Sequence, residues 1–476
     1  MSFLNIAADP LRLAALIGLG PLFMLGLGWL AVGPALHGSL TAKEPDTDLL
    51  QEIPLMLLAG LVVNYGAILI LQSLRIAALI SGLASLVGLG FLAASLWRHR
   101  HSWTWTAAGW AKAIGAALLW LVLLAPILGE RLEAWDARSI WFFHAKMIYT
   151  AGSIGESAGW QEPNVVAISH VDYPKMVPAL AAQAAHAMGL WNEYLPKAAL
   201  LWLLLPALLW LLTFARASWS FLALLLMLPF GLSSSSGTAT LWNGYMDAYL
   251  ALYFGIAVLL LGRYLKSSRA VDLASAGCIL LALPNLKNEG VLAALAGLPP
   301  LGYLIFRSVG FRFATLASAR HLRFYLAALA GLFPAVLWSS YSRHWGLTND
   351  LEVGTTQSVT RIVSRLLDGS YAIILARLWA TSRGAWLLVG MLAGAYLAWK
   401  ESLPRQILPA ALAGGSYCLG ILVIYLLTPY SVIWQLDTSM DRVVLSVSAC
   451  LYAASYFLLD QLETRQKAGN IRAKPD

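Results

Sequence analysis

Long apolar runs separated by short polar connections dominate the chain. The runs are roughly 18–25 residues long, which is the length that a helix needs to cross a hydrocarbon core of about 30 Å. Their apolar pattern is continuous, whereas the strands of closed barrels alternate in polarity. We expect about thirteen membrane-spanning helices, at 11–36, 54–72, 76–97, 107–128, 195–215, 219–236, 244–262, 271–286, 290–306, 322–340, 371–399, 406–428 and 442–460.

One apolar run, 176–190, is about fifteen residues long and too short for an ordinary span. We expect it to be re-entrant or to lie along the interface. All the basic connections can then be cytoplasmic together, as the positive-inside rule requires, and the N-terminus lies outside. The same parity places four polar segments on the outer side, namely 129–195, 231–243, 341–370 and 428–442.

Composition supports a protein that is dissolved in lipid. Apolar residues make up 59% of the 476 positions, only 12% are charged, and the mean hydropathy is +0.70. The net charge of +8 does not indicate nucleic-acid binding, because the basic residues lie in short connections between apolar runs. Cys278, Cys418 and Cys450 lie singly in apolar stretches, which is typical of buried, unreactive thiols.

Ionisable side chains at a membrane boundary are costly unless they are paired or hydrated, so they are candidates for function. The first group lies in "ERLEAWDARSIWFFHAKMIY" (130–149). Its apolar residues recur at helical spacing and predict a helix on the membrane surface, with Trp135 and Trp141 as interfacial anchors. Asp136 begins this helix, and a simple N-cap is the alternative explanation for it.

Four further groups follow in sequence. "SHVDYPKMVP" precedes the short apolar run and could alternatively be only an interfacial turn. "LWNGYMDAYL" places an amide and an acid one turn apart at the start of a span, where an acid also suits the helix dipole. "LPNLKNEGVL" and "WQLDTSMDR" could be a self-neutralising hairpin and a helix-start ion pair. The candidate residues are His170, Asp172, Tyr173 and Lys175; Asn243 and Asp247; Lys287, Asn288 and Glu289; and Asp437, Asp441 and Arg442.

The order of these motifs resembles that of the GT-C membrane glycosyltransferases. The likeness is closest to dolichyl-phosphate-mannose mannosyltransferase-like proteins and to lipid A aminoarabinose transferases, and it covers roughly 107–460. On this basis 107–460 is the catalytic module, 1–106 adds N-terminal membrane helices, and 461–476 is a basic cytoplasmic tail. The chain departs from the family in two ways: a lone Asp136 stands where an Asp-Glu pair is usual, and three extra spans precede the module.

The resemblance implies an all-α polytopic bundle with an outer layer of loops and juxtamembrane helices. It also implies transfer of a sugar, with inversion, from a polyprenyl-phosphate donor to a lipid or glycan acceptor outside the bacterial inner membrane. Acceptor attack needs a base, for which Asp136 is the candidate, and the departing phosphate needs cations. The expected phosphate ligands are Lys287, Arg442, Lys175 and His170; the expected sugar or acceptor ligands are Asp172, Tyr173, Asn243, Asp247, Glu289 and Asp437.

We expect neither a metal nor another cofactor, although Asp136, His170 and Asp172 could in principle bind a divalent ion. Three other functions stay open. A transporter would show internal repeats and broken helices near mid-membrane, and no convincing repeat is found. An envelope polysaccharide ligase or polymerase would favour an arginine-rich outer loop, and 341–370 contains three arginines. A purely structural membrane subunit is the third.

Overall fold

The computed structural model describes residues 10–41, 49–98, 107–214, 219–230, 233–234, 237, 239–309, 319–347, 349, 356–398, 400 and 402–472. Within these residues every regular element is a helix, which confirms the all-α prediction. Ten of the described helical segments are long and apolar enough to cross a membrane. The chain is therefore an integral membrane protein by length and composition of its helices.

A helix occupies each of the thirteen expected spans. Three of these helices fall outside the set of ten: α10 and α12 are short, with 12 and 13 residues, and α14 is not in the apolar set. The count of thirteen spans therefore stays a prediction. The helices are α2 (Pro10–Thr41), α3 (Leu49–Leu71), α4 (Leu74–Arg98), α5 (Ala107–Gly129), α9 (Ala198–Thr213), α10 (Trp219–Phe230), α11 (Met246–Ser267), α12 (Ala270–Ala282), α13 (Glu289–Val309), α14 (Ala319–His344), α16 (Ser370–Leu397), α17 (Leu408–Leu427) and α19 (Leu445–Arg472).

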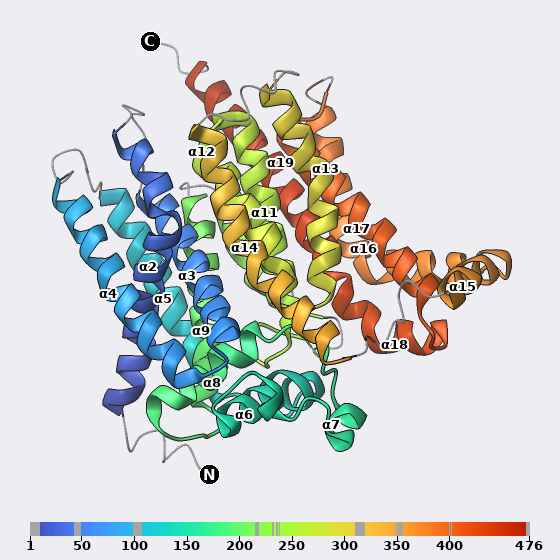
Figure 1. Ribbon diagram of the computed structural model, residues 1–476. Helices are drawn as coiled ribbons and strands as arrows, with labels where there is room; N and C mark the ends of the chain where they lie inside the picture. Colours follow the sequence, from blue (N-terminus) through green and yellow to red (C-terminus); the bar gives the residue numbers. More distant parts are fainter. Residues whose placement is uncertain are drawn as a thin grey trace.

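The long helices form one bundle (Figure 1). The first four helices and α9 lie on one side of it, and α11 to α14 with α16, α17 and α19 lie on the other. α3 connects the two sides, because it packs against α2 and α9 and also against α12 and α14. α9 and α11 are almost completely buried, whereas most of α4 and α16 is exposed at the bundle's periphery. Burial of apolar helices at the centre and exposure at the edge is the expected arrangement for a bundle in lipid.

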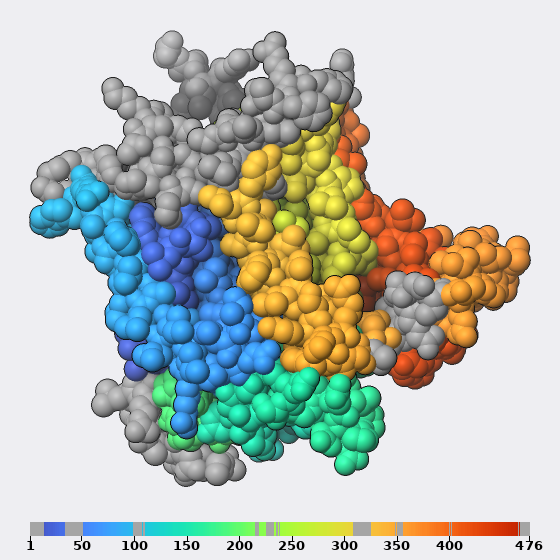
Figure 2. All heavy atoms as spheres, in the orientation of Figure 1, coloured from blue at the N-terminus to red at the C-terminus, as the bar shows by residue number. Residues whose placement is uncertain are grey.

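Short helices cover one end of this bundle, at the bottom of Figures 1 and 2. They come from the segment between α5 and α9: η1 (Ala137–Trp141), α6 (Phe142–Ala151), η2 (Glu156–Ala158), α7 (Pro163–Ile168), α8 (Met176–Met188) and η3 (Leu195–Lys197). The short apolar run forms α8, which packs against α6, α9 and α3. Figure 1 places it in this end layer beneath the long helices.

Two later segments reach the same end. α18 (Val432–Val443) directly precedes α19, and α15 (Thr356–Leu367) directly precedes α16. Hydrogen bonds join these segments to the end layer and to each other: Arg442 on α18 to Asp136, Asn349 ahead of α15 to Asp172, and Arg365 on α15 to the carbonyl of Tyr430 ahead of α18. Segments that were expected to share the outer side of the membrane thus share one end of the bundle.

Candidate functional site

Five ionisable side chains from distant parts of the chain meet at the covered end of the bundle. Nη1 of Arg442 lies 2.6 Å from Oδ2 of Asp136 and 3.8 Å from Oδ2 of Asp247. Nζ of Lys287 lies 2.7 Å from Oδ1 of Asp247 and 3.1 Å from Oε1 of Glu289. We call Asp136, Asp247, Lys287, Glu289 and Arg442 the charge cluster. It joins members of four of the five polar groups that the sequence singled out.

Each member is fixed at the end of a helix. Asp136 immediately precedes η1, Asp247 lies in the first turn of α11, and Arg442 lies in the last turn of α18. Lys287 lies in the tight turn between α12 and α13, which is closed by a hydrogen bond from the amide of Gly290 to the Lys287 carbonyl. A Cβ atom at position 290 would lie 2.0 Å from the Leu283 carbonyl oxygen, so glycine is needed for this close approach.

The charge cluster is graded from a partly exposed edge to a buried centre. The side chains of Arg442 and Asp136 are 14% and 13% exposed, whereas those of Lys287 and Asp247 are 3% and 4% exposed. Burial alone would lower the pKa of Lys287, but its ion pairs with Asp247 and Glu289 outweigh burial and raise it. Lys287 is therefore protonated at neutral pH, and three acidic side chains face two basic ones in the cluster.

Several polar atoms of the charge cluster are buried without a hydrogen-bond partner in the described part of the protein. They are Oδ2 of Asp247, Oε2 of Glu289 and Nε of Arg442. Such groups are costly unless they are satisfied. The two oxygens can accept hydrogen bonds from hydroxyl groups, and the guanidinium N–H can donate to an anion. The cluster therefore contains two acceptors for hydroxyl groups and one donor for an anionic group, all three of them buried in the structure.

The aromatic ring of Tyr245 lies against Arg442 of the charge cluster. The guanidinium carbon of Arg442 lies 5.0 Å from the centre of the Tyr245 ring, close enough for a cation–π contact. Burial, and then the negative charge of Asp136, raises the pKa of the Tyr245 hydroxyl, so Tyr245 is neutral. Sequence reasoning did not single out this tyrosine, although its position two residues before Asp247 was a usable signal.

Asp172 is connected to the charge cluster through a neighbour of Lys287. Its Oδ2 accepts hydrogen bonds from Nδ2 of Asn288 at 2.6 Å and from Nδ2 of Asn349 at 2.8 Å. His170 stacks on Tyr173 with ring centres 5.0 Å apart. Asn349 was not predicted, because a single asparagine in a polar loop carries no distinguishing pattern. The second polar group thus lies beside the other four groups, and the Asn288–Asp172 hydrogen bond connects it to them.

Lys175 does not join the cluster. It is fully buried, and its Nζ donates to the carbonyls of Val171 and Tyr173 at 2.8 and 2.7 Å. The amine also lies 4.7 Å from the ring centres of both Trp160 and Trp338. Burial lowers the pKa of Lys175 well below its usual value, although Asp172 opposes this. The hydrogen bonds of its amine therefore stabilise the 171–175 turn. They do not support the expected role of Lys175 as a phosphate ligand.

Two other candidate residues, Asp437 and Asn243, also lie outside the charge cluster. Asp437 forms an exposed ion pair with Arg377 on the outer side of α18. Asn243 was expected one helical turn before Asp247, but α11 begins only at Met246. Instead, Oδ1 of Asn243 accepts hydrogen bonds from the amides of Thr240 and Tyr245. Asn243 therefore shapes the turn that delivers Asp247 and Tyr245.

One alternative explanation and one expectation about the first polar group were wrong. Asp136 makes no side-chain capping hydrogen bond to η1, because its carboxylate is turned toward Arg442. Trp141 was expected to be an interfacial anchor, but it is only 1% exposed and packs in the core, whereas Trp135 is 60% exposed. A helix that is covered on several sides buries ring faces that an isolated surface helix would expose.

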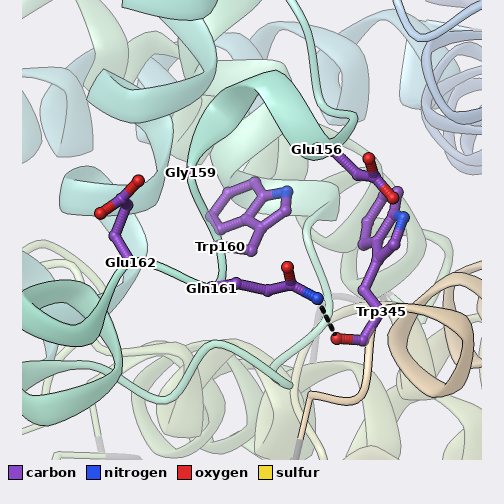
Figure 3. A pocket seen from close by; sticks show the side chains of 6 residues that line it. All are labelled: Glu156, Gly159, Trp160, Gln161, Glu162 and Trp345. Atoms are coloured by element: carbon purple, nitrogen blue, oxygen red, sulfur yellow. Dashed lines mark hydrogen bonds between the residues drawn. The ribbon is translucent and has the colours of Figure 1, made fainter.

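Two hollows lie outside the charge cluster. One, of about 120 Å³, is lined by Glu156, Gly159, Trp160, Gln161, Glu162 and Trp345, and Figure 3 shows Gln161 donating to the Trp345 carbonyl across it. The other, of about 50 Å³, includes Arg263 and Lys266 near the opposite end of α11. Among the described residues no group of three or more His, Cys, Asp or Glu side chains is arranged to hold a metal ion.

Neither the sequence nor the structure of this chain places it in a family by comparison. No protein-family model, no curated protein and no solved structure matches it.

Proposed function

We propose that the chain is a membrane glycosyltransferase. It moves a sugar from a polyprenyl-phosphate donor to a lipid or glycan acceptor on the outer side of a bacterial inner membrane, with inversion at the anomeric carbon. One observation carries this proposal: at the covered end of the bundle, Arg442 joins a partly exposed carboxylate, Asp136, to the buried Asp247–Lys287 pair, beside which Glu289 lies. A base and two cations are thereby held next to each other.

The chemistry follows from these positions. The acceptor hydroxyl attacks the anomeric carbon opposite the phosphate, and its proton passes to the Asp136 carboxylate. The bond between the anomeric carbon and the phosphate oxygen breaks, and the electron pair leaves with the polyprenyl phosphate. Arg442 and Lys287 stabilise the charge that develops on that phosphate. A phosphate at Arg442 also competes with Asp136 for the guanidinium, and the released carboxylate is then the better base.

The remaining acids are suited to the sugar. The unpartnered oxygens of Asp247 and Glu289 can accept hydrogen bonds from sugar hydroxyls, and so satisfy their own buried charge. His170 and Tyr173, stacked beside Asp172, offer an aromatic face of the kind on which sugar rings pack. Asn288 connects this region to the charge cluster, because it donates a hydrogen bond to Asp172 and directly follows Lys287 in the chain. Asp172 and its two hydrogen-bond partners, Asn288 and Asn349, then bind the sugar together.

The rival enzymatic function has less support. A ligase or polymerase would use arginines of the 341–370 segment to hold its lipid-linked donor. Arg361 and Arg365 instead donate hydrogen bonds to backbone carbonyls of Leu427, Tyr425, Leu426 and Tyr430. These two arginines connect α15 to the end of α17 and to the turn that follows it. The charge cluster is therefore the better candidate for a phosphate-binding site.

The deciding experiment is sugar transfer by the purified protein in liposomes, with a radiolabelled polyprenyl-phosphate sugar and extracted envelope lipid as acceptor. Asp136→Asn is expected to lower the transfer rate by about 10²–10⁴-fold, the usual contribution of a general base. The matched control is Asp437→Asn, which removes an exposed carboxylate paired with Arg377 and should retain activity.

Equal transfer by Asp136→Asn and wild type would remove the proposed base. Solute movement across sealed vesicles without any covalent product would favour a transporter instead. Both variants are compared by thermal unfolding, so that a loss of activity is not mistaken for a loss of folding.

A further inference from the structure

The short helix α15 has three distinct faces. The first, formed by Ser358, Arg361, Ile362 and Arg365, is buried or half-buried against the protein. The second, formed by Gln357, Thr360, Ser364 and Asp368, is polar and exposed. The third consists of Val359, Val363, Leu366 and Leu367, which are 47–84% exposed. Their spacing of four, three and one residues places all four on one side of a helix.

α15 leads directly into a candidate membrane span that also exposes apolar side chains. α15 ends at Leu367 and α16 begins at Ser370, only three residues later. α16 is a candidate span with an exposed apolar surface near its start, including Ile373 and Leu375. Figure 1 shows α15 projecting sideways from the bundle beside α16 and above α18, and its orange atoms protrude in Figure 2.

We infer that α15 lies in the plane of the membrane surface, with its apolar face inserted among lipid chains and its polar face in water. Helices with this division of faces bind at the headgroup boundary. Lipid is the occupant that the observations select, because α15 is connected by only two residues to a candidate membrane span whose own exposed side chains near its start are apolar. This inference is independent of the catalytic proposal above.

The packed face of α15 connects this lipid contact to the charge cluster. Arg365 donates to the carbonyls of Tyr425, Leu426 and Tyr430, and Arg361 donates to that of Leu427. These carbonyls belong to the end of α17 and the turn that leads into α18, whose last turn carries Arg442. A helix held at the lipid surface therefore braces the segment that positions Arg442.

The test measures the depth of single spin labels in full-length protein reconstituted in phosphatidylcholine–phosphatidylglycerol vesicles. Labels are placed at Val363→Cys on the apolar face and at Ser364→Cys, the neighbouring residue on the polar face. Labelled wild type sets the background from the native cysteines, of which Cys278 and Cys450 are buried. We expect collisions with lipid-soluble oxygen to exceed those with a water-soluble nickel chelate at position 363, and the reverse at position 364.

Each other outcome overturns the inference. Preferential collision with the nickel chelate at both positions would place α15 in water. Restricted access of both reagents at position 363 would show that another protein surface, such as a second copy of the chain, covers the apolar face. Leu367→Cys provides a second position on the apolar face, so that a local effect of one label does not decide the result.

Discussion

The buried centre of the charge cluster makes Lys287 the residue with the largest expected effect on stability. Its buried amine forms ion pairs with both Asp247, which is also buried, and Glu289. Removing one partner of a buried ion pair leaves an uncompensated charge, which costs about 3–5 kcal/mol. We therefore expect Lys287→Met to lower the midpoint of thermal unfolding in detergent markedly.

Two comparisons give this prediction its specificity. Lys266→Met, at an exposed lysine near the other end of α11, should leave the midpoint almost unchanged. Adding Asp247→Asn to Lys287→Met should recover part of the loss, because one of the two stranded carboxylates is then neutral. An unchanged midpoint in Lys287→Met would mean that the pair is hydrated rather than buried.

The buried histidine of the end layer predicts how stability depends on pH. His144 is fully buried and its Nε2 lies 2.8 Å from Oγ of Ser169. Burial, and then the positive charge of Lys175, lowers the pKa of His144 well below 6.5. Below pH 6.5 the unfolded chain binds a proton that the folded chain does not, so stability falls as pH falls, by up to about 1.4 kcal/mol per pH unit.

His144→Gln keeps a hydrogen-bonding group beside Ser169 but removes the titrating ring. We expect the unfolding midpoint of this variant to change less between pH 6.5 and pH 5 than that of wild type. His186→Gln, at a half-buried histidine in the last turn of α8, is the control and should keep the wild-type dependence. Parallel curves for wild type and His144→Gln would exclude His144 as the source.

Residue types and their place at span ends were sufficient to select all five members of the charge cluster. Asp136, Asp247, Lys287, Glu289 and Arg442 were all candidates, and the structure brings them together. Their partners could not be predicted, since pairing joins residues as far apart as 136 and 442. Lys175 shows the opposite limit: its sequence position resembles the others, but local carbonyls and two tryptophan rings enclose its amine.

At the scale of helices, the closest packing lies between α2 and α3. A Cβ atom at Gly60 would lie 1.8 Å from the Met24 carbonyl oxygen, and one at Gly28 would lie 1.7 Å from that of Met56. Small residues allow two helix backbones to approach in this way. Gly60→Ala should therefore force the helices apart and destabilise the protein by about 1–3 kcal/mol.

Gly18→Ala is the matched control, because no atom lies within 4 Å of a Cβ built at this glycine in the same α2 helix. It should fold and unfold as wild type does. The measurement is the thermal midpoint of each purified variant. If Gly60→Ala matched Gly18→Ala, the two helices would have to be further apart than the structure places them.

Helices themselves were the most predictable feature, since continuous apolar runs of sufficient length have few other structures open to them in lipid. α15 was not predicted, although Val359, Val363 and Leu366 recur at helical spacing within the 341–370 segment. Because the segment contains many polar and basic residues, it was predicted to be part of a loop. The span expected at 219–236 corresponds to α10, which ends earlier, at Phe230. The last four residues of the expected span are the serines 233–236, which do not favour an apolar helix.

At the scale of the whole molecule, the two ends of the bundle differ in their connections, and we expect the end with short basic connections to be cytoplasmic. The end with the charge cluster carries the long segments between α5 and α9 and between α14 and α16. Along α11 the chain runs from Asp247 at this end to Lys266 at the other, a rise of roughly 28 Å that matches a hydrocarbon core of about 30 Å. Short connections with Arg263, Lys266, Arg269, Lys400 and Arg405 gather at that other end.

This asymmetry predicts that the charge cluster faces outward. Glu162→Cys, at an exposed residue on the rim of the hollow in Figure 3, should react with a membrane-impermeant maleimide in intact spheroplasts. Lys266→Cys should react only after the membrane is permeabilised, and wild type reports the native thiols. The reverse pattern would place the cluster in the cytoplasm. Sugar donors on the cytoplasmic side would then be within reach, and the extracytoplasmic acceptor proposed here would not.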